Sequence, residues 1–91
     1  MDLFKIVETV TECRDTRDLV WSINRSPIDE ASAIAGYVAN CEGQEYYGTS
    51  EGAVIRSLKS LENSGAVFNF DEAYRMALVV CWVDYDFSLE A

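Results

Sequence analysis

The segment SEGAVIRSLKSLENSGAV, residues 50–67, constrains the fold most, because the sequence marks both the ends of a helix and its buried side. A serine or threonine just before the pattern can accept a hydrogen bond from a backbone N–H of the first turn. Val54, Leu58 and Leu61 recur at the spacing of a helical stripe that packs on a core. Gly65 can adopt the left-handed conformation that ends many helices. We therefore expect a helix that ends just before this glycine.

The stretch SPIDE marks the start of another helix, over residues 27–41. Ser26 is suited to cap it and Pro27 to occupy its first position. Asp29 and Glu30 fall in the first turn, where negative charge is favourable near the positive end of the helix dipole. The residues expected on its buried side are Ala31, Ile34, Val38 and Cys41. Those expected on its exposed side are Asp29, Ser32, Gly36 and Asn40.

Two further helices are predicted before this one. The first runs from Asp2 to about Cys13, and the second, residues 15–24, is capped by Asp15 or Thr16. Its Trp21, like Trp82 near the other end of the chain, is interpreted as a core residue.

The C-terminal third is predicted to contain β-structure. AVFNF reads as a strand, and the β-branched and aromatic residues of MALVVCWVDY favour a second one. The alternative for the second segment is a fifth helix capped by Asp71.

The order of these elements resembles a winged helix-turn-helix domain. The stretches DLVWSINRSP, ASAIAGYVA and GAVIRSLKSLENSGAV carry the resemblance over about residues 15–70. It implies a mainly α fold of the α+β class, in one domain over residues 1–91, with four helices followed by a C-terminal β-hairpin. In this reading 1–14 is an extra helix, 15–65 the helix-turn-helix-like core, and 66–87 the wing. The connection CEGQEYYGTS is longer than the turn of three or four residues that such motifs use.

The composition argues against catalysis and against a membrane segment. The chain has no histidine, which removes the commonest metal ligand and general base, and its three cysteines are widely spaced. We therefore expect no enzyme activity, no metal site, no cofactor and reduced thiols that are mostly buried. The longest apolar run is far shorter than the roughly 20 residues of a membrane span, and no secretory signal is evident, so a cytoplasmic protein is expected.

The charge favours a basic protein over DNA as the partner. The net charge is −9, from 16 acidic and 7 basic residues, whereas a typical DNA-binding protein engages roughly 6–10 phosphates with cations. Carboxylates can instead stand in for phosphates on a basic, nucleic-acid-handling protein, as a phage- or plasmid-encoded inhibitor or anti-repressor would do. The predicted acidic face comprises Asp29, Glu30, Glu42, Glu45, Tyr46, Tyr47 and Glu51.

Two further interactions are predicted from the same patterns. A DNA-binding regulator is the alternative function, acting through the helix over residues 50–64 and as a dimer. Its contact residues would be Gly52, Arg56, Lys59, Ser60 and Asn63. The apolar residues of segment 67–85 predict a homodimer through that segment.

Overall fold

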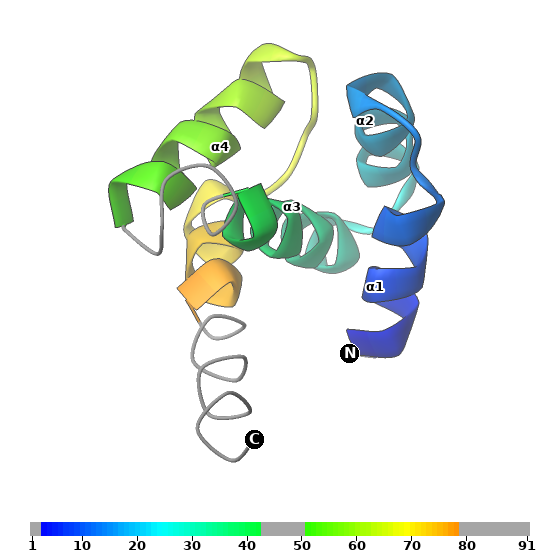
Figure 1. The fold of residues 1–91 in the computed structure, drawn as a ribbon, viewed down its shortest axis with the longest axis horizontal. Coiled ribbons are helices and arrows are strands. Elements are labelled where there is room, and N and C mark those ends of the chain that lie inside the picture. Colours follow the sequence, from blue (N-terminus) through cyan, green and yellow to red (C-terminus); the bar gives the residue numbers. More distant parts are fainter. Residues whose placement is uncertain (1–2, 43–50, 79–91) are drawn as a thin grey trace.

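The computed structural model describes residues 3–42 and 51–78, and all the regular structure within these two ranges is helical. The helices are α1 (Leu3–Glu12), α2 (Thr16–Arg25), α3 (Ile28–Glu42) and α4 (Glu51–Asn63), and a fifth covers residues 70–78. α3 lies at the centre, and α1, α2 and α4 each pack on it (Figure 1). Across these ranges no helix has the length and apolar character needed to cross a membrane. The four helices predicted from the sequence correspond to α1, α2, α3 and α4 and are confirmed.

α3 is buried on nearly all sides along its middle, which corrects part of the sequence interpretation. Ala31, Ile34 and Val38 are buried as predicted, but Cys41 is exposed. The prediction that Ser32, Gly36 and Asn40 face solvent is wrong, since all three are buried. The reason is the central position of α3: neighbouring helices cover it from several directions, so its middle has no solvent-exposed face.

Gly36 lies where α3 crosses the helix 70–78. A Cβ atom at this position would be 2.5 Å from the carbonyl oxygen of Ala73 and 2.8 Å from the Cβ of Met76. One helical turn further on, the buried Asn40 donates a hydrogen bond of 3.0 Å from Nδ2 to the carbonyl oxygen of Ala77. The preference for a strand at 76–85 is therefore wrong for residues 76–78, and residues 79–85 lie outside the described ranges.

Residues 66–69 form a connector in place of the expected strand. Ala66 and Phe68 are buried whereas Val67 and Asn69 are exposed, so burial alternates along the connector as it would along a strand. Two of its backbone N–H groups donate to side chains: that of Val67 to Oδ1 of Asn24 at 2.7 Å, and that of Asn69 to Oγ of Ser32 at 2.9 Å. The expected wing is thus absent from residues 66–78, and residues 79–87 lie outside the part described.

The end of α4 and the start of the next helix are each fixed by interactions among neighbouring residues. Gly65 has a φ of 101°, as predicted for the residue that terminates α4. The N–H of Ala66 donates to the carbonyl oxygen of Leu61 at 3.1 Å, which satisfies a carbonyl at the helix end. Asn69, and not Asp71, caps the helix 70–78, because its Oδ1 accepts a 3.0 Å hydrogen bond from the N–H of Glu72.

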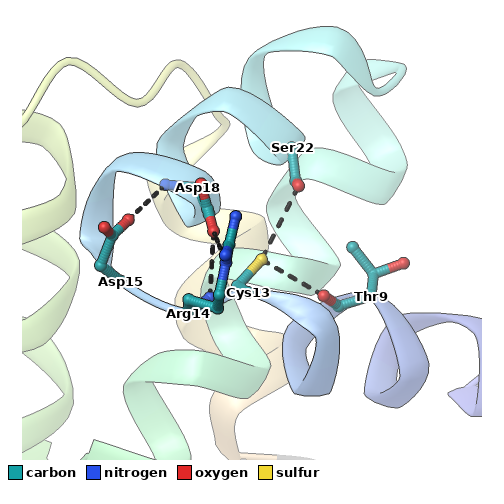
Figure 2. A network of polar contacts seen from close by, with 6 residues as sticks. All are labelled: Thr9, Cys13, Arg14, Asp15, Asp18 and Ser22. Atoms are coloured by element: carbon teal, nitrogen blue, oxygen red, sulfur yellow. Dashed lines mark hydrogen bonds and ion pairs between the residues drawn. The ribbon is translucent and has the colours of Figure 1, made fainter.

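The corner between α1 and α2 is fixed by a small polar network (Figure 2). Asp15 caps α2 by accepting a 2.9 Å hydrogen bond from the N–H of Asp18, which confirms the predicted start of this helix. The Asp18 carboxylate accepts the N–H of Arg14 at 3.1 Å and pairs with its guanidinium. The half-buried Cys13 thiol donates to the carbonyl oxygen of Thr9 at 3.2 Å, and Cys41 is exposed, so neither of these two cysteines is buried as the thiols were mostly expected to be. Cys81 lies outside the described residues.

Candidate functional site

The outer face of α4 carries the residues that the DNA-binding alternative requires. Val54, Leu58 and Leu61 are buried, as predicted. All five residues predicted to contact DNA are exposed, namely Gly52, Arg56, Lys59, Ser60 and Asn63, and Glu62 of the same helix is exposed as well. The structure therefore brings this predicted set together on one face of one helix, with two cations among five residues.

The predicted acidic face is divided between the two ends of α3. Asp29 and Glu30 lie in its first turn, and Glu42 is its last residue. A helix rises about 1.5 Å per residue, so Glu42 is roughly 20 Å away from the other two. Glu51 is the first residue of α4. Glu45, Tyr46 and Tyr47 lie outside the described residues.

Asp29 and Glu30 instead line a groove together with Glu72, Arg75 and Met76, none of which was among the predicted site residues. This open groove of about 700 Å³ lies between the first turns of α3 and the helix 70–78. Its lining residues are Pro27, Asp29, Glu30, Ser32, Glu72, Arg75 and Met76. We call it the acidic groove, because three carboxylates from two distant parts of the chain line it beside one guanidinium.

The acidic groove has apolar as well as charged walls. Pro27 and Met76 contribute the apolar surface. Glu30 is partly engaged, since its Oε1 lies 3.6 Å from Nζ of Lys5, and both side chains are solvent-exposed to a large extent. An exposed pair of this kind contributes at most about 1 kcal/mol, so Glu30 can exchange this partner for another cation.

Sequence reasoning missed Glu72, Arg75 and Met76, because it favoured strands on both sides of DEAYR. A signal was present: Glu72, Arg75 and Met76 follow the spacing i, i+3 and i+4 of one helical face. The helical alternative, had it been preferred, would have grouped them.

Sequence reasoning also misplaced Trp21. The prediction that it belongs to the core is wrong: its side chain is 60% exposed, while Leu19 and Ile23 provide the buried side of α2. Arg25 covers the indole, with Cζ 4.1 Å from the ring centroid. Together with Arg17, these residues follow the spacing i, i+4 and i+8, which places them on one exposed stripe.

In residues 3–42 and 51–78, no group of three or more histidine, cysteine, aspartate or glutamate residues is placed to hold a metal ion. Comparison of the chain with protein-family models, curated proteins and solved structures finds no match. The surfaces of the described residues are therefore the basis for a proposed function.

Proposed function

We propose that this chain is a protein-binding domain whose acidic groove holds a basic segment of a partner protein. The single observation that carries the proposal is the convergence of Asp29, Glu30 and Glu72 around a groove with apolar walls. A partner that normally handles nucleic acid would present such a basic segment, so occupation of the groove would make the chain an inhibitor or anti-repressor.

A lysine or arginine side chain matches the groove in both of its parts. The aliphatic stem can lie along Pro27 and Met76, and the charged end can reach the carboxylates. Arg75 repels a cation placed beside it, which favours one position of the basic side chain over others. This combination of attraction and repulsion gives the groove selectivity as well as affinity.

DNA binding through α4 is the second candidate, supported by the exposure of its five predicted contact residues. Arg56 and Lys59 are the cations on that face, and each phosphate that is neutralised requires one. In a chain with a net charge of −9, a second copy would raise the number of such cations from two to four, which is below the roughly 6–10 phosphates that a typical DNA-binding protein engages.

The test compares two variants that lose the same charge at different places. Asp29→Asn with Glu72→Gln neutralises the groove, and Glu8→Gln with Glu62→Gln neutralises two exposed carboxylates elsewhere. Binding of a fluorescent lysine- and arginine-rich peptide is measured by anisotropy. We expect the groove variant to lose about tenfold in affinity, equivalent to ~1.4 kcal/mol, and the control variant to change little.

Equal losses in both variants would show that the peptide responds to overall charge, and would contradict the groove. A parallel titration with duplex DNA tests the second candidate, for which binding should fall steeply with salt and be lost in Arg56→Glu. Proteins retained from a cell lysate by the wild type and the control variant, but not by the groove variant, would then identify the partner.

A further inference from the structure

We infer that the outer face of α2 is a second binding surface, and that its partner is an acidic amphipathic helix of another protein. This surface, which we call the α2 face, consists of Arg17, Trp21, Arg25 and Val67. It shares no residue with the acidic groove and has the opposite charge preference, so the inference goes beyond the proposed function.

Core packing does not account for Trp21. Leu19 and Ile23 already fill the inner side of α2, whereas most of the indole is exposed. Arg25 lies over one face of the ring, which holds a guanidinium beside an apolar surface. Tryptophan and arginine side chains are enriched among the residues that dominate the energy of protein interfaces.

Val67 extends the α2 face because Asn24 holds the connector against the end of α2. Oδ1 of Asn24 accepts the N–H of Val67 at 2.7 Å, and its Nδ2 donates to the carbonyl oxygen of Gly65 at 3.0 Å. Ala66 and Phe68 anchor the connector on the core, yet the Val67 side chain between them is 67% exposed. A large apolar side chain is thus held at a fixed place next to a tryptophan-bearing helix.

The spacing of the two arginines on α2 indicates which kind of partner helix would fit them. Arg17 and Arg25 are eight residues apart on α2, which is about 12 Å along the helix axis. Two carboxylates that are two turns apart on a partner helix have nearly the same spacing. An apolar side chain between those carboxylates would then meet Trp21.

Nearby acidic residues do not cancel these cations. Asp18 is engaged by Arg14, and Asp15 caps the helix, while Arg17 and Arg25 point outward. At physiological salt, charges beyond about 8 Å are largely screened, so a short partner helix responds to the local cations more than to the net charge. A long polyanion such as nucleic acid would extend over the acidic remainder of the molecule.

The test uses a fluorescent amphipathic peptide with two glutamates two turns apart and leucines between them. We expect the full chain to bind it, with Trp21→Ala weakening binding about 30-fold, equivalent to ~2 kcal/mol. Arg17→Glu should weaken it at least as much. Lys59→Glu makes the same charge change on α4 and should leave binding within about twofold. Far-UV circular dichroism checks that each variant is folded.

Three outcomes would overturn the inference: no binding of this peptide, equal losses in Arg17→Glu and Lys59→Glu, or tighter binding of a single-stranded oligonucleotide through Trp21. The groove variant Asp29→Asn with Glu72→Gln separates this inference from the proposed function. It should retain the acidic peptide while losing the basic one, so either proposal can fail without the other.

Discussion

At Gly36 the absence of a side chain sets how closely two helices approach. The nearest atoms to a Cβ built there belong to the backbone of Ala73 and Ala77 and to the Cβ of Met76, and none of them can rotate away. Since Met76 and its neighbours line the acidic groove, Gly36 positions the groove without touching a ligand. The absence of a side chain at Gly36 therefore affects the shape of the candidate site.

Gly36→Ala is expected to destabilise the fold by about 1–3 kcal/mol, because the helix 70–78 has to move to admit the methyl group. Two other glycines provide matched comparisons. Gly52→Ala meets nothing within 4 Å and should be neutral or stabilising by up to ~1 kcal/mol. Gly65→Ala should be destabilising for another reason, namely its φ of +101°. Urea unfolding followed by circular dichroism measures all three, and equal stability of the Gly36 and Gly52 variants would contradict the close crossing.

At the level of elements, two backbone N–H groups of the connector over residues 66–69 depend on side chains for their hydrogen bonds. Asn24 of α2 and Ser32 of α3 accept N–H groups that a neighbouring strand would otherwise accept. Ser32 is buried and also donates to the carbonyl oxygen of Ile28 at 2.9 Å. A single hydroxyl thus joins α3 to the start of the helix 70–78.

Ser32→Ala is expected to cost about 1–3 kcal/mol, because the N–H of Asn69 loses its acceptor. Ser60→Ala, on the exposed face of α4, is the control and should change the free energy of unfolding by less than ~0.5 kcal/mol. Hydrogen exchange gives a local measurement: the amide of Asn69 should exchange faster in the Ser32 variant. Unchanged protection of that amide would show that Ser32 is not its acceptor.

At the level of the whole molecule, negative charge is in excess and ion pairs do little to balance it. In the described part of the chain, the two ion pairs given by the structure, Lys5–Glu30 and Arg14–Asp18, both have N–O distances of 3.6 Å and exposed partners. Repulsion among 16 acidic residues therefore opposes the compact state. Binding of a basic partner would relieve part of that repulsion.

Salt is expected to stabilise the unbound chain. Between about 0.01 and 0.1 M sodium chloride the screening length falls from about 30 to about 10 Å, which weakens repulsion across the molecule. The urea midpoint should therefore rise over this range. It should rise less in the variant Glu8→Gln with Glu62→Gln, which has two fewer negative charges. A midpoint that falls with salt would mean that attractive pairs outweigh the repulsion.

Local signals explain which elements could be predicted from the sequence. Asp15 caps α2 and Gly65 ends α4 through bonds to residues only a few positions away, so a short stretch contains the necessary information. Ser32 and Asn40 were misplaced because their partners are 37 residues further along the chain. A polar residue is predicted to be exposed unless its distant partner is known.

The candidate site, too, was predictable only where its residues are marked by local signals. Asp29 and Glu30 were identified from the helix start, but their neighbour Glu72 depends on the path of residues 66–69. That path was read as a strand, whereas the structure has a connector in which the buried Ala66 and Phe68 alternate with exposed residues. Alternating burial can also arise from a connector anchored at two points.

The anchoring of this connector has a consequence for how the chain opens. Residues 66–78 are held to α2 and α3 by hydrogen bonds that span 37 to 43 residues of sequence, whereas α1, α2 and α3 follow one another directly. Contacts of such separation form late and are released as a unit, so we expect this segment to behave as one foldon. Glu72 and Val67 both belong to it. One sub-global opening would therefore dismantle the acidic groove and the α2 face together, while the first three helices stay folded.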